Sequence, residues 1–204
     1  VVHGTKAILA AIDKRVTVTT TTTKKQTLKI NSQLGTFEIP MYEGRTEIPD
    51  SYRAYDSVLD MSQSTRRSDF LADKIKSEFR PFVYLVAKLT DITRSNYTPH
   101  FAIERANGPQ WRRPGLEITI DSDIPIGVGL GSSSACCVAA AASVYAIFSE
   151  CLGKELEYLT RNEDILKLGK NKTEDILSLA KETERIIFPD TSGADCSVCT
   201  YGGM

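Results

Sequence analysis

The 204-residue sequence has no excess of charge of either sign, no long apolar run and only two histidines. Its 25 Lys and Arg are balanced by 26 Asp and Glu, which gives a net charge of −1. Without a basic excess the chain has little to neutralise a run of phosphates, so we expect no nucleic-acid partner. The longest apolar run, 135–148, is shorter than a bilayer-spanning helix and contains Ser143. We therefore expect no membrane partner either.

Several catalytic motifs are also missing. The two histidines, His3 and His100, lie in weakly structured contexts and no G-x-S-x-G is present, which argues against a serine hydrolase. The glycine-rich segment 125–134 has no lysine, so it is not a Walker A loop. Its evenly spaced glycines do not fit G-x-G-x-x-G, and the lysine and aspartate motifs of protein kinases are lacking. These three nucleotide-binding classes are excluded.

The chain begins without a methionine, a basic leader or a signal-type apolar run, and it ends directly after a predicted strand. We therefore expect a fragment of a cytoplasmic protein, with one domain over 1–204 and a loop-rich insertion at about 31–114. Five cysteines, an odd number, argue against a disulfide framework. Cys196 and Cys199 form a C-x-x-C, but on the strand predicted there the two thiols face opposite sides and cannot share a metal.

Hydrophobic periodicity predicts an α+β fold, in which helices pack on one side of a sheet. Apolar, alternating or β-branched runs predict strands at 7–12, 16–23, 27–30, 36–39, 116–120 and 196–201. The threonine-rich strand 16–23 is expected at an edge of the sheet. Helical spacing is found at 68–89, with a break at Pro81, and at 132–150, 156–168 and 173–187.

The segment 125–134 carries the clearest signal for a ligand. Its glycines, Gly127, Gly129 and Gly131, let the backbone approach a ligand closely and adopt positive φ. Serines 132–134 then open a helix, whose unpaired N–H groups and positive dipole end favour an anion. A hydroxyl in that turn can also reach a magnesium ion. From the residues alone, phosphate binding and a tight strand-to-helix turn with a serine cap remain open.

Residues 125–135 resemble the second conserved motif of the superfamily that comprises galactokinase, homoserine kinase, mevalonate kinase and phosphomevalonate kinase. Within it, the similarity is greatest to the mevalonate kinases, because two further segments agree. Residues 1–4, Val-Val-His-Gly, resemble the end of their N-terminal motif. Residues 184–203 resemble their Glu-Arg…Ser-Gly-x-Asp-Asn-x-Val-Ser-Thr-x-Gly-Gly segment. The resemblance is strong toward the end of the chain and weak between 31 and 114.

The resemblance implies the superfamily's N-terminal domain, with a ribosomal protein S5 domain 2-like fold, and a C-terminal ferredoxin-like domain beyond Met204. It implies phosphorylation of mevalonate to 5-phosphomevalonate in isoprenoid and sterol biosynthesis, with ATP and Mg²⁺ as cofactors. Asp195 is implied as the catalytic group on the substrate hydroxyl, Ser133 and Glu184 as magnesium ligands, and Ser192 as part of the substrate region. The implied ATP contacts are Ser122, Gly127, Val128, Gly129, Leu130, Gly131, Ser132 and Ser133.

The chain also departs from the family pattern. The family's catalytic lysine, in Pro-Gly-Lys, would precede Val1, so we expect the 204-residue chain alone to be nearly inactive. Thr183 stands where the family usually has Gly, and Cys196 where it has Asn. Phe188, Pro189 and Thr191 replace the usual residues of His-Gly-x-Pro. These changes concern substrate positioning.

Alternatives follow from the same residues. The acceptor could instead be phosphomevalonate, a sugar or homoserine, or the protein could be a catalytically inactive nucleotide-binding relative. Without the resemblance, Glu184 fits a solvated helix carboxylate and Asp195 a turn-stabilising residue. The sequence also leaves open whether Asn31 or Ser32 contacts the nucleoside, and whether the protein forms a homodimer.

Overall fold

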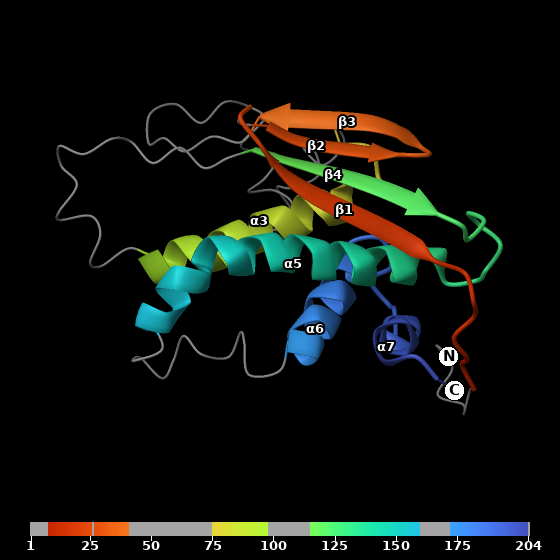
Figure 1. Cartoon of the computed structure of the whole chain (residues 1–204). Helices are drawn as coiled ribbons and strands as arrows, with labels where there is room; N and C mark the ends of the chain where they lie inside the picture. Colours follow the sequence, from red (N-terminus) through yellow and green to blue (C-terminus); the bar gives the residue numbers. More distant parts are fainter. Residues whose placement is uncertain (1–7, 26, 41–74, 98–114, 160–171, 204) are drawn as a thin grey trace, which may run out of the picture.

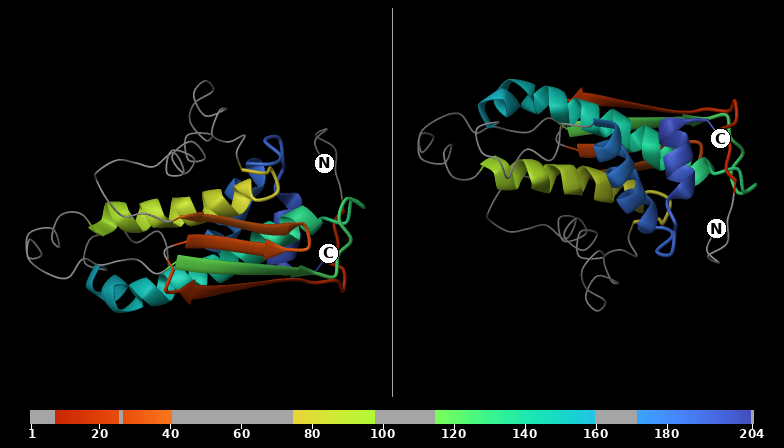
Figure 2. Two further views of the ribbon diagram at one scale, coloured as in Figure 1. Left: turned by 90° about the horizontal axis from the view of Figure 1, so that it is seen from above. Right: turned by 90° about the horizontal axis from the view of Figure 1, so that it is seen from below.

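The computed structural model describes residues 8–25, 27–40, 75–97, 115–159 and 172–203. Within these ranges a four-stranded sheet forms one layer, and helices cover one of its faces (Figures 1 and 2). This arrangement confirms the α+β fold predicted from the periodicity. Of the predicted elements, residue 7 and the segments 68–74 and 160–168 lie outside the described ranges.

The sheet has the order β1-β4-β2-β3. It is formed by β1 (Val16–Thr23), β2 (Thr27–Ser32), β3 (Gly35–Pro40) and β4 (Gly115–Ser122). Strand β4 pairs antiparallel with β1 and parallel with β2, and β2 and β3 form an antiparallel hairpin. The β-branched residues of β1 suit a pleated edge. Its edge position was predicted correctly.

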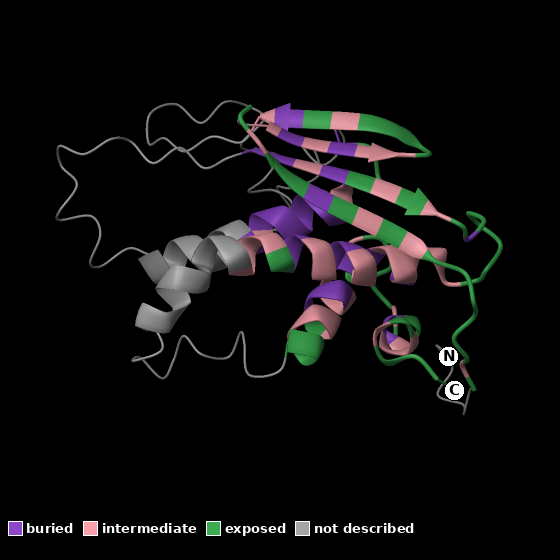
Figure 3. Ribbon diagram, in the orientation of Figure 1, coloured by how far each residue is buried: buried purple, intermediate pink, exposed green. Residues whose placement is uncertain are grey.

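The core lies between the sheet and the helices. Leu28, Ile30, Leu116 and Ile118 are almost fully buried core residues of β2 and β4. Figure 3 shows buried positions alternating with more exposed ones along the strands. Helix α5 (Ser132–Leu159) packs against the sheet with α3 (Arg80–Tyr97) beside it, and α6 (Lys172–Arg185) and α7 (Ala194–Tyr201) pack against α5 on its side away from the sheet (Figure 1). Small residues in the middle of α5 let this central helix lie close to the sheet, and removing the facing apolar surface from water stabilises the layers by about 25 cal/mol per Å².

Helix α3 begins later than its periodicity indicated. Residues 75–79 are not helical and the helix starts at Arg80, so the helical pattern is interrupted just before Pro81, which lies in the first turn of α3. Proline is tolerated there because its missing N–H would have no intrahelical partner. Both β3 and α3 lie in the range predicted as a loop-rich insertion, and they contribute Ile39, Phe82 and Val83 to the core. The described part of that range therefore belongs to the fold.

The strand predicted at 7–12 is not formed by its described residues. Residues 8–12 carry no regular structure, and Ile8 and Ile12 are 88% and 47% exposed. An apolar run becomes a strand only where the backbone of a neighbouring strand pairs with it. In the described sheet β1 is paired on one side only, with β4, and residues 8–12 do not pair with the open side of β1. The backbone N–H of Ala11 instead donates to the carbonyl of Gly203 (2.9 Å).

The strand predicted at 196–201 is also wrong, because these residues belong to helix α7. Gly193 precedes the helix in the left-handed conformation, and Gly202 ends it. The hydroxyls of Ser197 and Thr200 donate to carbonyls four residues earlier, which lets these β-favouring residues sit in a helix.

Helix α5 is longer than the predicted 132–150. Its window Ser132–Ser149 has the length and the mean hydropathy, 1.5, of a membrane-spanning helix. The prediction that the apolar run 135–148 is too short for a membrane-spanning helix is therefore wrong. In this fold, however, the helix packs against the sheet and against α3, α6 and α7, with Ala140, Ala141 and Val144 fully buried. These contacts are those of the core helix of a globular domain.

Candidate functional site

The loop that connects β4 to α5 has the backbone that the sequence predicted. Gly127, Gly129 and Gly131 have φ of 78°, 77° and 71°, in the left-handed region that favours glycine. Between them Val128 and Leu130 are exposed, at 56% and 50%. The first helical hydrogen bond of α5 runs from Ala135 N–H to the Gly131 carbonyl. The N–H groups before it, in the first turn of α5, are those that a helix leaves without intrahelical partners.

Asp195 lies beside the end of this loop. It is an exposed residue in the first turn of α7, directly after the left-handed Gly193. A Cβ placed on Gly131 would lie 3.8 Å from Asp195 Oδ2. The fold thus brings the carboxylate implied as catalytic against the loop implied to bind phosphates.

Glu184 lies near the end of α6 and is almost fully buried, at 3% exposure. This contradicts the alternative of a solvated helix carboxylate. The Ser134 hydroxyl donates to its Oε1, the Thr191 hydroxyl donates to Oε2 (2.7 Å), and the Cys196 thiol donates to Oε2 (3.5 Å). Burying a carboxylate is costly unless it is hydrogen-bonded, and these three donors meet that need.

The serine that contacts Glu184 is Ser134 and not Ser133. Ser133 faces a different direction on the first turn of α5 and lines a cavity, whereas Ser134 is buried toward α6. The magnesium ligation that the resemblance implies for Ser133 and Glu184 therefore stays a prediction. In the described ranges, no three His, Cys, Asp or Glu side chains are grouped as a metal site.

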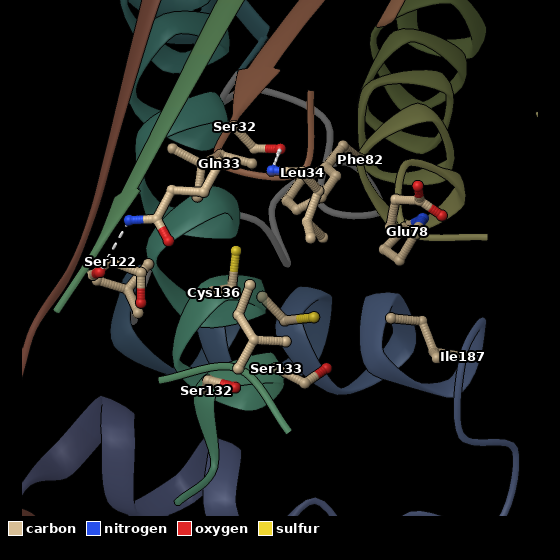
Figure 4. A pocket seen from close by; sticks show the side chains of 15 residues that line it. Ser32, Gln33, Leu34, Glu78, Phe82, Ser122, Ser132, Ser133, Cys136 and Ile187 are labelled. Atoms are coloured by element: carbon tan, nitrogen blue, oxygen red, sulfur yellow. Dashed lines mark hydrogen bonds between the residues drawn. The ribbon is translucent and has the colours of Figure 1, made fainter. Parts of the chain in front are cut away.

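The cavity, about 200 Å³ in volume, lies between the β2–β3 hairpin, the start of α3 and the start of α5 (Figure 4). Among the predicted site residues, Ser122, Ser132 and Ser133 line it, together with Ile126 of the loop. The loop residues 127–131, Glu184, Ser192 and Asp195 do not line it. The predicted site is thus divided into a mostly apolar cavity and a polar region where the loop meets α7.

Three consecutive residues of the β2–β3 hairpin line the cavity, namely Ser32, Gln33 and Leu34. Asn31 instead donates its side-chain amide to Glu117 (2.8 Å) across the sheet. The Gln33 amide donates to the Ser122 carbonyl (3.2 Å), which ties the hairpin to the end of β4 (Figure 4).

Two predicted site serines stabilise turns. The Ser122 hydroxyl donates to the Ile124 carbonyl (3.1 Å) and accepts from the Ile124 N–H (3.2 Å), at the point where β4 ends. The exposed Ser192 accepts from the Ala194 N–H (3.3 Å) just before α7. Both serines shape the backbone that presents the site.

The described cysteines are free thiols. Burial raises the pKa of Cys136 and of Cys196 to about 12, and the nearby Glu184 adds to the shift at Cys196. The pKa of Cys137 is raised well above 9 for the same main reason. On helix α7 the pair Cys196 and Cys199 shares a side more nearly than a strand would allow, but Cys196 is buried and Cys199 is exposed. These thiols are protonated at neutral pH and act as small apolar or donor groups.

Sequence reasoning missed the residues that surround Glu184. Thr191 and Cys196 were visible as departures from the family pattern, and Ser134 as the last of three consecutive serines. Their common feature, a short donor side chain, gains meaning only when the fold brings three separate elements to one carboxylate.

A family model of the GHMP kinases N terminal domain matches residues 96–203, just over half of the chain. The mevalonate kinase of Pyrococcus horikoshii is 36% identical over 104 residues, which are 51% of this chain and 25% of that protein. The mevalonate kinase of Archaeoglobus fulgidus is 37% identical over 90 residues, 44% of this chain and 25% of that protein. The chain thus aligns with about a quarter of the length of these relatives. A crystal structure of mevalonate kinase has a TM-score of 0.52 at 17% identity, over 93% of this chain and 42% of that one, which shows a shared fold.

Proposed function

Because the chain belongs to the GHMP kinase family, we propose that the full-length protein transfers the γ-phosphoryl group of ATP to mevalonate and so produces 5-phosphomevalonate. The observation that carries this proposal is the contact between the glycine loop and Asp195. Phosphoryl transfer needs donors around the phosphates and a group that orients the attacking hydroxyl, and we propose that the loop and the neighbouring Asp195 supply them. The mevalonate kinases among the relatives support the choice of acceptor.

In this proposal the loop and the cavity bind different parts of the nucleotide. The backbone of residues 127–131 and the first turn of α5 hold the phosphates, because N–H groups and the helix dipole point toward an anion. The cavity lined by Ser122, Ser132 and Ser133 receives the nucleoside. Its volume of about 200 Å³ is below the roughly 300–1,000 Å³ of a site for a whole drug-sized ligand, so it suits one part of the nucleotide.

The oxygen atoms of Glu184 and Ser133 are of the kind that Mg²⁺ prefers, although in this structure Ser133 faces the cavity and not Glu184. With a nucleotide bound, Mg²⁺ takes most of its ligands from phosphates and water and needs only one or two carboxylates, so the lack of a three-residue cluster in the described ranges is no obstacle. We propose Glu184 and Ser133 as its protein ligands. When bound, the ion would supply positive charge to neutralise the charge that develops on the phosphates.

Asp195 orients the acceptor and takes the proton of its hydroxyl in this proposal. Its exposure at the start of α7 leaves it accessible to a substrate, and its position beside Gly131 places it next to the phosphates. A carboxylate within hydrogen-bond reach of the hydroxyl can accept that proton as the new P–O bond forms. We further propose a small-molecule acceptor and a cytoplasmic location for the full-length protein.

The test is ADP release by the full-length protein with ATP and Mg²⁺, measured separately with mevalonate, phosphomevalonate, galactose and homoserine. Turnover selective for mevalonate supports the proposal. Turnover with another of the four keeps the kinase and replaces the acceptor. Nucleotide binding without turnover on any of them contradicts the proposal and favours an inactive nucleotide-binding relative.

A further inference from the structure

Thr191 lies in the turn between α6 and α7, and its one hydroxyl forms hydrogen bonds in two directions. The hydroxyl donates to Glu184 Oε2 (2.7 Å) and accepts from the backbone N–H of Gly193 (3.2 Å). Glu184 belongs to the last turn of α6, and Gly193 directly precedes α7. A side chain with a single polar atom thus links the end of one helix to the start of the next.

The Glu184 end of this link is held in the core. Glu184 is almost fully buried, and its Oε1 accepts from the hydroxyl of Ser134, which lies in the first turn of α5. Its backbone carbonyl accepts from the N–H groups of Ile187 (3.0 Å) and Phe188 (2.9 Å) in the turn that follows α6. Moving Glu184 would break buried hydrogen bonds, which is costly, so it is a fixed point shared by α5 and α6.

The Gly193 end of the link sets where α7 begins. Gly193 is buried in the left-handed conformation, and its carbonyl accepts from the Ser197 N–H (3.1 Å) in the first turn of α7. A Cβ on Gly193 would lie 2.7 Å from Cε of Lys181, so the stem of that lysine of α6 also restrains it. Asp195 follows two residues later. A shift of Gly193 would therefore move the Asp195 carboxylate relative to the glycine loop.

We propose that Thr191 is a positioning residue, which holds Asp195 beside Gly131 by tying the start of α7 to Glu184. This inference rests on the proposed function, in which Asp195 takes the proton of the acceptor hydroxyl. A displacement of about 1 Å at a reacting group can slow a reaction by about 10²-fold, so losing a bond that sets such a position should reduce turnover. The link needs only a Glu184 oxygen that accepts a hydrogen bond, and it involves no metal ion.

The test measures ADP release by the full-length protein with ATP, Mg²⁺ and mevalonate. Thr191→Val keeps the shape of the side chain and removes the hydroxyl, so both hydrogen bonds are lost. The kcat should fall by about 10- to 100-fold, while the KM for ATP should change by no more than about twofold, because Thr191 is proposed to act on Asp195 and not on the nucleotide.

Two variants are matched controls. Thr191→Ser keeps the hydroxyl and should retain the kcat and the KM of the unmodified protein. Thr200→Val removes a hydroxyl that donates to the Cys196 carbonyl (2.8 Å) within α7, and it should leave both values unchanged. A loss of kcat in Thr200→Val as large as that in Thr191→Val would mean that any lost hydroxyl near α7 has this effect, and would overturn the positioning role.

A double-mutant cycle separates positioning from a general loss of structure. If Thr191 acts through Asp195, Thr191→Val should slow turnover far less in the Asp195→Asn background than in the unmodified protein, because the carboxylate that it positions is already gone. Equal effects in the two backgrounds overturn the positioning role and leave the proposed function in place. Unchanged turnover in Asp195→Asn overturns both the catalytic role of Asp195 and this inference.

A second measurement does not require turnover. Amide hydrogen exchange of the full-length protein, followed by NMR, should become about tenfold faster at Gly193 and Ser197 in Thr191→Val, because the acceptor that holds this turn is lost. If Thr191→Val does not fold, Thr191→Ala removes the same hydroxyl without placing a methyl group against Glu184, and the same results are expected of it. Unchanged exchange at both amides overturns the inference.

Discussion

Asp195 Oδ2 lies 3.8 Å from the point where a side chain would begin on Gly131. The two residues belong to the ends of different segments, the loop after β4 and the first turn of α7, and they meet because α7 packs against the start of α5. The contact places a carboxylate beside the glycine loop, close to the first turn of α5. A phosphate held by those groups and a hydroxyl held by that carboxylate would be neighbours.

Asp195→Asn tests the carboxylate in the full-length protein. The amide keeps the size of the side chain but cannot take the hydroxyl proton, so turnover should fall by about 10²–10⁴-fold while ATP binding is retained. ADP release and ATP titration check the two parts. Asp190→Asn, an exposed aspartate in the preceding turn, serves as the control and should retain turnover. Unchanged turnover in Asp195→Asn would remove this residue from catalysis.

Gly131→Ala tests the backbone of the loop. Alanine at a φ of 71° is strained by about 1–2 kcal/mol, so the loop should shift and nucleotide affinity should fall. Gly202→Ala meets a similar φ of 70° at the end of α7, where a Cβ finds open space. Because Gly202 also has a ψ of −168°, in a region essentially restricted to glycine, Gly202→Ala should lose at least as much stability in urea unfolding, but only Gly131→Ala should bind ATP more weakly. Equal affinity in the two would separate the loop from nucleotide binding.

Gly115→Ala tests the junction between β4 and the β1–β2 turn. A Cβ there would lie 1.8 Å from the Lys25 carbonyl oxygen and 2.6 Å from that of Thr27, so backbone must move. We expect a loss of about 1–3 kcal/mol or more in the free energy of unfolding, as for overpacked sites. Gly35→Ala, where a Cβ finds open space and only a φ of 124° is strained, should lose less. A smaller loss for Gly115→Ala than for Gly35→Ala would contradict the packing of this junction.

The half-buried thiol of Cys136 predicts a loss of stability at alkaline pH. Its pKa rises from 9.0 to about 12 on folding, so below pH 9 the thiol is protonated in both states. Between pH 9 and 12 the unfolded chain loses this proton and the folded chain keeps it, so the free energy of unfolding falls as the pH rises. In Cys136→Ala the free energy of unfolding should fall less steeply with pH, by a slope that corresponds to about one proton. Urea unfolding measured at several values from about pH 8 to 10.5 checks this. Identical slopes in both proteins would show that the thiol is not shielded.

The sequence predicted the parts of this molecule that depend on local pattern. Strands with alternating or β-branched residues, such as 16–23 and 116–120, and the amphipathic helix at 173–187 are confirmed within about two residues, because their periodicity and their burial agree. The strand predicted at 196–201 is wrong because the turn at Gly193 and packing against α5 override a composition that favours a strand. The strand predicted at 7–12 is not formed by residues 8–12 because no described strand pairs with them.

The candidate site likewise contains features that local sequence pattern predicts and features that it does not. The positive φ of the loop glycines follows from glycine spacing alone, and its position before α5 follows from the serines. The donors around Glu184 could not be predicted, because Ser134, Thr191 and Cys196 converge only through tertiary contacts. Which of two adjacent serines faces Glu184 depends on the rotation of α5 about its axis, and motif matching does not fix that rotation.

The order β1-β4-β2-β3 has a consequence for how the chain folds as it is synthesised. Strand β4 joins β1 to the β2–β3 hairpin, yet it follows both of them by a long stretch of sequence. Such non-local pairing slows folding and leaves the earlier strands with unpaired edges while they wait. The threonine-rich composition of β1 keeps its waiting edge polar, which lowers the risk of pairing with another chain. Because the glycine loop directly follows β4, the proposed nucleotide site forms only after β4 has joined the sheet.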